Sequence, residues 1–255
     1  ILLAGCGQPS QSETTHSVSS AANSNQESRY GGRLVLSTTS DPKSFNPVLA
    51  KETSTTFVTG FLFEGLTRMN PETVQPEGNL AESWEISDDG LRWIFTLREG
   101  LTWSDGQPLT SADVVFTFND LVFNEDIPSS ARDIFTIEGQ TISVRALDER
   151  RVEFVLPVPF APFLMALGQD ILPEHVLKSK VEAGTFSSDW GLNTPPEEII
   201  GSGAFALAEY IPGQFIRLRR NENYWKRDEQ GQALPYLEEV HIVIVQNQDV
   251  ELLKF

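Results

Sequence analysis

The sequence is poor in cysteine and histidine. Its 255 residues contain one cysteine, Cys6, and three histidines that lie far apart, His16, His175 and His241. A single thiol excludes an internal disulfide framework and a cysteine-based zinc site. The histidines match no metalloprotease spacing, and the position of His241 in a predicted strand favours a face residue over a ligand. We therefore expect no metal site.

Basic residues and long apolar runs are also scarce. The 36 Asp and Glu outnumber the 19 Lys and Arg and give a net charge of −17. Such a surface repels nucleic acid and anionic headgroups, so no nucleic acid is expected as a partner, whereas cationic or zwitterionic solutes are tolerated. The alternative is that the acidic charge only keeps the protein soluble. No segment has the roughly 18 consecutive apolar residues that predict a membrane span.

Catalytic motifs are absent or fall where a structural role is favoured. No phosphate-binding or dinucleotide-binding glycine loop is present. The pair Asp88-Asp89 suggests the two carboxylates of a glycosidase, but it lies in a predicted tight turn. The segment Gly201-Ser202-Gly203 lacks the G-x-S-x-G spacing of a nucleophile elbow. We therefore expect that the chain is not an enzyme and uses no cofactor.

The N-terminal residues have the features of an exported lipoprotein. The stretch Leu3-Ala4-Gly5-Cys6 is similar to a lipobox, so residues 1–6 are interpreted as the end of a secretory signal, with Cys6 as the lipid attachment site. A chance cysteine after an apolar stub is the alternative. Two or three acyl chains would anchor the protein to the membrane. Residues 7–30 are mostly small and polar, which predicts a flexible tether.

From Gly31 onward, predicted strands alternate with predicted helices. Turn residues at Asp88-Asp89-Gly90 and Pro212-Gly213 separate the strands of two hairpins. A cap at Thr110 begins one helix. The mixed order with many antiparallel strands predicts an α+β fold. The predicted strands are 33–37, 84–87, 91–97, 141–147, 151–156, 204–210, 215–219 and 240–246, and the predicted helices are 53–66, 110–121, 161–167 and one from 173.

The tryptophans could stack on a ligand or pack in the core. Trp84 and Trp93 are predicted to face each other across a hairpin, which favours a cross-strand core pair. Trp103 and Trp225 lie beside turn segments, where half-buried packing and ligand contact are both open.

Several ordered segments together resemble the family 5 extracellular solute-binding proteins, which are the dipeptide, oligopeptide and nickel receptors of ABC importers. The resemblance extends over about residues 31–255. The segments that carry it are Ser40-Asp41-Pro42, Phe45-Asn46-Pro47, Leu80–Gly90, Arg98–Phe116, Gly201–Phe205, Arg220–Trp225 and Leu234–Leu237.

This resemblance implies a periplasmic-binding-protein-like architecture with an inserted extra domain. Domain I would comprise residues 31–50 and 195–248, and residues 51–194 would be the domain II insert. Domain III would begin at 249–255, so the fold is expected to be incomplete at the C-terminus. The ligand would lie between domains I and III, with one crossing of the hinge near residues 246–250.

The same resemblance implies a function and a site. Ser37, Thr38, Thr39 and Ser40, small polar residues at the end of the first strand, would line the cleft, although a plain strand-end turn is the alternative. A peptide can add to an exposed strand edge through backbone hydrogen bonds. The implied role is capture of peptides or similar small solutes for ABC permease subunits, in the periplasm or at the outer face of the cytoplasmic membrane. A receptor for a metal chelate, opine or sugar, or a degenerate lipoprotein that no longer transports, are the alternatives.

Overall fold

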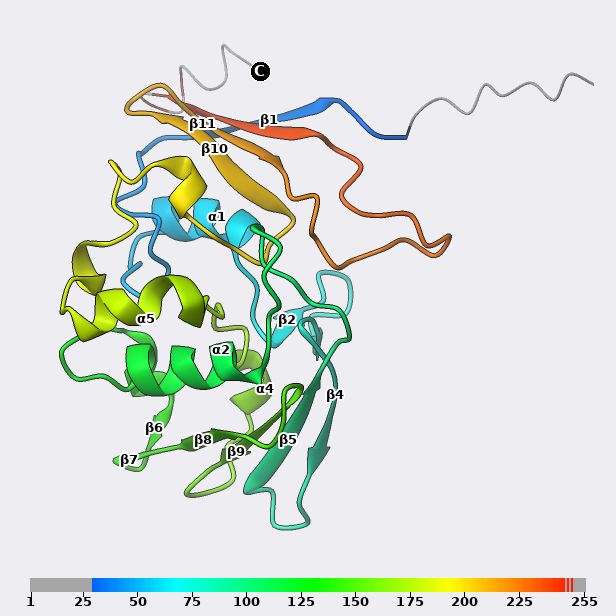
Figure 1. Cartoon of the computed structure of the whole chain (residues 1–255), viewed down its shortest axis with the longest axis vertical. Coiled ribbons are helices and arrows are strands. Elements are labelled where there is room, and N and C mark those ends of the chain that lie inside the picture. Colours follow the sequence, from blue (N-terminus) through cyan, green and yellow to red (C-terminus); the bar gives the residue numbers. More distant parts are fainter. Residues whose placement is uncertain (1–28, 246, 248, 250–255) are drawn as a thin grey trace, which may run out of the picture.

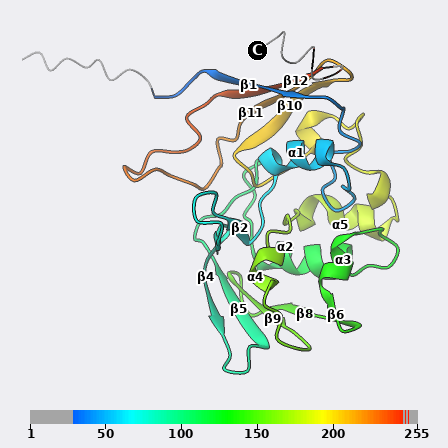
Figure 2. The same cartoon turned by 180° about the vertical axis from the view of Figure 1, so that it is seen from behind.

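The computed structural model describes residues 29–245, 247 and 249 and contains two four-stranded sheets with helices between them (Figures 1 and 2). Cys6 and the predicted tether as far as residue 28 lie outside the described residues. The last two tether residues contact the body of the protein: the Tyr30 hydroxyl donates to Ala233 O at 2.9 Å, and Arg29 contacts Asp228 at 3.7 Å.

The upper sheet joins the two ends of the described chain. Its strand order is β1-β12-β11-β10, with β1 parallel to β12 and the other pairs antiparallel. Alternate side chains of β11 and β12, Ile216 and Ile242 among them, are fully buried against α1 and its neighbours. The four strands are β1 (Arg33–Thr38), β10 (Phe205–Ile211), β11 (Phe215–Arg220) and β12 (Glu239–Ile244).

The lower sheet is antiparallel and corrects one prediction. Trp84 lies opposite Phe95 and Trp93 lies opposite Ile86, so the two tryptophans are not direct cross-strand partners. The turn is closed by Ser87, whose N–H donates to Arg92 O, and this shifts the register by two. Both indoles pack on the Phe95 ring instead. The strands, in spatial order, are β4 (Ala81–Ile86), β5 (Arg92–Leu97), β9 (Arg151–Val155) and β8 (Ser143–Ala146).

The helices fill the space between the sheets. The helix α1 (Thr53–Leu62) lies under the upper sheet, and α2 (Ser111–Phe116) lies over the lower one. The predicted helix 53–66 ends at Leu62 because Phe63 is extended. The remaining elements are α3 (Ala131–Ile134), α4 (Phe163–Ala166), α5 (Glu174–Glu182), a π-helical turn (Thr117–Val122), 3-10 turns (Phe186–Ser188, Pro196–Glu198), and the short strand pairs β2 (Thr67–Met69) with β3 (Pro76–Gly78) and β6 (Thr136–Ile137) with β7 (Gln140–Thr141).

The cap predicted at Thr110 is confirmed. Thr110 Oγ1 accepts from Ala112 N at 3.3 Å, and Asp113 Oδ2 accepts from Thr110 N at 2.8 Å, which forms a capping box. The helix then widens into the π-helical turn. There the Thr117 hydroxyl donates to Asp113 O at 2.8 Å and accepts from Leu172 N at 2.9 Å.

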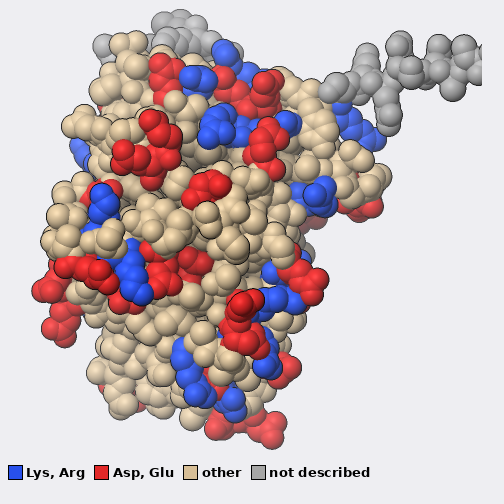
Figure 3. Space-filling model, in the orientation of Figure 1, with Lys and Arg blue, Asp and Glu red and all other residues tan. Residues whose placement is uncertain are grey.

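Buried side chains form two clusters, one per sheet. The cluster at the lower sheet contains Phe95 and Trp103, both fully buried. The cluster at the upper sheet also includes Leu62 and Trp190, which lie in the predicted insert 51–194. The division into domains I and II therefore stays a prediction. Within the described ranges, no helix is long and apolar enough to cross a membrane. On the face in Figure 3, acidic and basic side chains are interspersed.

Candidate functional site

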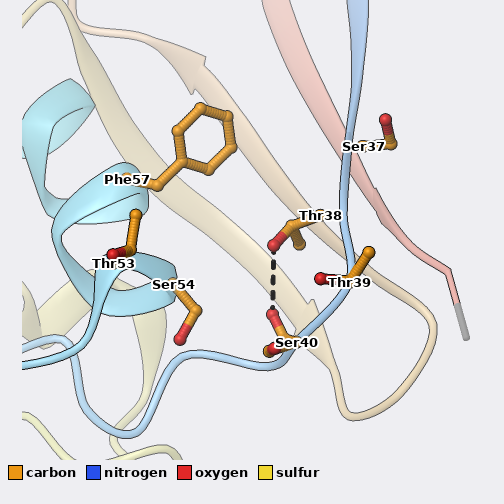
Figure 4. Close-up of a pocket in the computed structure, with 7 residues that line it drawn as sticks. All are labelled: Ser37, Thr38, Thr39, Ser40, Thr53, Ser54 and Phe57. Atoms are coloured by element: carbon orange, nitrogen blue, oxygen red, sulfur yellow. Dashed lines mark hydrogen bonds between the residues drawn. The ribbon is translucent and has the colours of Figure 1, made fainter. Parts of the chain in front are cut away.

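A hollow of about 380 Å³ opens where β1 ends beside the first turn of α1 (Figure 4). The structure brings all four predicted residues, Ser37 to Ser40, into its wall. The facing wall is supplied by Thr53, Ser54 and Phe57 of α1. Two segments that are separate in the sequence therefore meet at one surface depression.

The lining is uncharged and rich in hydroxyl groups. Six of the seven lining residues carry a hydroxyl, and the seventh presents a phenyl ring. Within the hollow, the Thr38 hydroxyl donates to Ser40 O at 3.3 Å. A hydroxyl can both donate and accept, so this wall suits a neutral polar ligand such as a peptide backbone or a sugar. The exposed Phe57 ring adds an apolar contact surface.

Two side chains hold the loop after β1 in place. Asp41 Oδ1 accepts from the Tyr210 hydroxyl at 2.7 Å and from Gly213 N at 2.9 Å, which ties the loop to the β10–β11 turn. The hydroxyl of the fully buried Thr55 accepts from Lys43 N at 2.9 Å, which ties the loop to α1. Burial, and then the Asp41 carboxylate, raise the pKa of Tyr210. These bonds connect the loop after β1 to both the upper sheet and α1.

The backbone of β1 offers hydrogen-bonding groups on its outer edge. Gly32 O accepts from Glu239 N of β12, and Thr38 O accepts from Val245 N just after β12. Successive residues of a strand direct their backbone N–H and C=O groups to opposite edges. The N–H and C=O of Val35 therefore point away from β12. No further strand pairs with β1 among the described residues. This edge runs toward the hollow.

The start of α1 adds donors to the facing wall. Glu52, the residue before the helix, makes no side-chain cap bond, and no acidic side chain lies in the first turn. The first N–H groups of a helix have no acceptor within the helix. Thr53 and Ser54 therefore bring the positive end of the helix to the edge of the hollow.

Sequence reasoning missed the α1 half of this hollow. The apolar residues Phe57, Val58, Phe61 and Leu62 recur at helical spacing, which predicts the helix over residues 53–66 but does not say which of them is exposed. In the structure Val58 and Leu62 are buried, whereas Phe57 is 36% exposed. No signal in the sequence singles it out, because adjacent positions of a helix can both belong to a broad apolar stripe and packing decides which of them is exposed.

The residues that the sequence suggested for catalysis or for ligand stacking have structural roles. Ser202 is 1% exposed, and its hydroxyl accepts from Glu64 N at 3.0 Å. Asp89 Oδ1 accepts from Leu91 N at 3.1 Å, which stabilises the β4–β5 turn. Trp103 is fully buried in the core, so it does not face a ligand. In the part of the chain that is described, no three His, Cys, Asp or Glu side chains are grouped to hold a metal ion.

Comparison with known proteins places this architecture in a family. The model of the bacterial extracellular solute-binding proteins, family 5 (middle region), matches residues 75–255. The chain belongs to this family. The matched region takes in the lower sheet and the strands β10, β11 and β12 of the upper sheet, whereas β1 and α1 precede it in this family 5 chain.

The relatives differ in what their names say they bind. A periplasmic alpha-galactoside-binding protein of Rhizobium meliloti is 35% identical over 71% of this chain and 28% of its own length. A dipeptide-binding protein of Escherichia coli is 31% identical over 75% of this chain and 38% of its own. A structure of the periplasmic binding protein DppA from Helicobacter pylori, in complex with the peptide STSA, has a TM-score of 0.73 at 26% identity, over 89% of this chain and 45% of its own.

A second solved structure carries a sugar. The periplasmic binding protein MelB of Agrobacterium fabrum, in complex with stachyose, has a TM-score of 0.73 at 27% identity, over 85% of this chain and 34% of its own. This family 5 chain therefore spans less than half the length of each of these four proteins.

Proposed function

We propose that this protein is the substrate-binding component of an ABC importer, that it is not an enzyme, and that it captures peptides or similar small solutes outside the cytoplasmic membrane. Membership of the solute-binding family supports the general role. The observation that carries the local assignment is the hydroxyl-lined hollow at the end of β1, with Ser37, Thr38, Thr39 and Ser40 in its wall.

The geometry suggests how a peptide would be held. Its backbone would form hydrogen bonds with the outer edge of β1. Such pairing does not depend on the side chains of the peptide, which suits a receptor for mixed nutrients. Its carbonyl oxygens would accept from the first N–H groups of α1 and from the hydroxyls of Thr53 and Ser54. Such contacts contribute about 0.5–1.5 kcal/mol each in water, so tight capture needs a second wall that encloses the ligand. In the proposed receptor, the predicted domain III supplies that wall and the permease subunits receive the solute.

An oligosaccharide is a second candidate ligand, favoured by one specific observation. The hollow combines six hydroxyl-bearing residues with the exposed ring of Phe57, and it contains no charged side chain. Sugars are bound by polar groups at their rims and by aromatic rings at their faces. The alpha-galactoside-binding relative and the stachyose complex agree with this chemistry.

Calorimetric titration of the complete gene product would separate these candidates. Mixed di- to pentapeptides and alpha-galactosides would be tested against the wild type, Thr53→Val and Phe57→Ala. We expect Phe57→Ala to weaken sugar binding by about tenfold or more and peptide binding by less, because a backbone-paired peptide relies less on the ring. Ile134→Ala, which removes an exposed side chain on α3, serves as the control. Unchanged affinity in both hollow variants for every solute that binds would show that the site lies elsewhere.

The lipid anchor is a separate proposal, based on the lipobox-like stretch before Cys6. Acylation of this thiol would hold the protein at the outer face of the cytoplasmic membrane. Metabolic labelling of the full precursor with palmitate should mark the wild type and leave Cys6→Ser unlabelled. Equal label and equal membrane fractionation in both would exclude the anchor.

A further inference from the structure

A second hollow, of about 420 Å³, lies where the end of α1, the strand β2 and residues 165–170 meet. Its wall contains two carboxyl groups, Glu64 and Asp170, and the guanidinium of Arg68. Two neighbouring carboxyl groups that are shielded from water repel each other when both are charged. One of the two carboxyl groups is therefore expected to bind a proton more readily than an isolated carboxyl group does.

Glu64 has the partners of a charged carboxylate. Its Oε1 accepts from the Tyr224 hydroxyl at 2.6 Å and its Oε2 accepts from the Trp225 indole at 2.6 Å. An indole N–H can only donate, so a protonated Glu64 keeps both bonds only if its proton lies on Oε1 and the Tyr224 hydroxyl turns from donor to acceptor. Burial raises the pKa of Glu64, while both donors and the charges of Arg68 and Lys226 oppose that rise.

Asp170 has no such support. Its carboxyl group makes no hydrogen bond or ion pair within the described part of the chain, and the residue is half-buried. The next residue, Ile171, donates its N–H to Glu64 O at 3.0 Å, which holds Asp170 close to Glu64. Of the two groups, Asp170 is the one that can be neutral without any rearrangement of a hydrogen bond.

The other charged groups around the hollow are already engaged. From β2, Arg68 pairs with Glu77 of β3 at 2.6 Å. From the loop after β11, Lys226 faces Glu64 and Glu77 as well as two arginines, Arg68 and Arg98, and burial is the main cause that lowers its pKa. Glu64 is the only charge with a marked effect on Asp170 among the described residues.

We propose that Glu64 and Asp170 form a proton-operated junction: Asp170 holds a proton while Glu64 stays charged, and loss of that proton loosens residues 165–171 from α1 and β2. The contacts at risk include the bond from Ile171 N to Glu64 O and the bond from Thr67 N to Leu167 O, at 3.2 Å. This junction connects the helix that lines the β1 hollow with the part of the chain that leads to the lower sheet. The proposal does not depend on the identity of the solute.

The direction of the pH effect follows from the environment of Asp170. Burial, and then the charge of Glu64, raise the pKa of Asp170 to about 7 in the folded protein. An unfolded chain releases this proton near pH 4, so between about pH 4 and 7 the folded state binds more protons. The contribution of Asp170 to stability is therefore largest at acidic pH, falls as the pH rises through that window, and is constant above it.

Urea unfolding of the whole chain and of Asp170→Asn tests the proposal. The asparagine mimics the protonated acid, so the ratio of wild-type to variant unfolding constants should rise roughly 10- to 100-fold between pH 5 and pH 8. Asp133→Asn, at an exposed position on α3, is the matched control and sets the baseline for the loss of a surface carboxyl group. A ratio for Asp170→Asn that rises no more than this baseline would overturn the proposal.

Two further measurements cover the case in which a variant fails to fold. The carboxyl carbon of Asp170, followed by NMR in the wild type, should titrate near neutral pH. Titration together with the exposed aspartates would refute the proposal. Glu64→Gln removes the repelling charge, so it should move the Asp170 midpoint to lower pH, and an unmoved midpoint would also count against the pair.

Discussion

Two glycines lie where the chain crosses the end of α1, and replacing them should be strongly destabilising. A Cβ atom at Gly201 would lie 2.0 Å from Leu62 O, and one at Gly203 would lie 2.4 Å from Phe61 O. The clash falls on backbone atoms, so no side-chain rotation relieves it. Gly203 N also donates to Leu62 O at 2.8 Å. Overpacking by about 1–3 kcal/mol predicts that Gly201→Ala lowers the free energy of unfolding by roughly 2 kcal/mol. The weakened bond of Gly203 adds about 1 kcal/mol, so Gly203→Ala should lower it by roughly 3 kcal/mol.

The same substitution at Gly60 provides a control with the opposite sign. Gly60 is exposed in α1, and a Cβ atom there meets nothing within 4 Å. Gly60→Ala should raise the free energy of unfolding by about 0.5–1 kcal/mol, since alanine restricts the unfolded chain and favours the helix. Urea unfolding followed by tryptophan fluorescence measures all three, and the yield of folded protein reports on a variant too unstable to titrate. If the free energy of unfolding of Gly201→Ala or Gly203→Ala lies within about 1 kcal/mol of that of Gly60→Ala, the close contact between these glycines and the end of α1 does not require glycine, and the prediction is wrong.

Three other experiments test interactions that support the fold. A double-mutant cycle of Asp41→Ala with Tyr210→Phe should give a coupling of about 1–2 kcal/mol, and additive effects would mean that their hydrogen bond does not hold the loop of the β1 hollow. Glu153 is 2% exposed, and its pKa is lowered, mainly by the hydrogen bond from Arg145. Glu153→Gln should therefore lower the free energy of unfolding by about 1–3 kcal/mol at pH 7. This loss should become smaller at pH values below the usual glutamate range, because Glu153 of the wild type is then protonated and its ion pairs with arginine are lost as well. Urea unfolding at pH 3 and pH 7 measures the loss, and an equal loss at both pH values would contradict the prediction. Thr110→Ala should lose about 1 kcal/mol through its cap, whereas Thr110→Ser should retain most of it in thermal unfolding.

Local signals in the sequence were sufficient for most elements of this fold. The hairpin β10–β11 and its turn at Gly213, which has a φ of +69°, were predicted from alternation and a Pro-Gly pair. The cap at Thr110 was equally readable, because its partners lie within three residues. The π-helical turn that follows was not, since it accompanies a contact between Thr117 and Leu172, 55 positions apart. A contact between residues so far apart in the sequence produces no periodic pattern from which it could be predicted.

The candidate site divides in the same way. The resemblance to a family indicated residues 37–40, and the structure places them in the wall of one hollow. Their partners on α1 could not be assigned, because the packing of the helix decides which side of its broad apolar pattern is exposed. The Glu64–Asp170 pair was missed for a related reason: the two residues are separated by more than a hundred positions, and neither lies in a motif. Only the folded chain brings them together.

The parallel pairing of β1 with β12 has a consequence for the order in which the protein folds. Arg33 is opposite Glu239, so the first strand waits for a partner that is synthesised about 200 residues later. The lower sheet has no such delay, because β4, β5, β8 and β9 all lie between residues 81 and 155. We expect the lower sheet to form early and the upper sheet to close in a slow, late step. During that interval the apolar residues Leu34, Val35 and Leu36 form an unpaired strand that a chaperone can bind and that another chain can join.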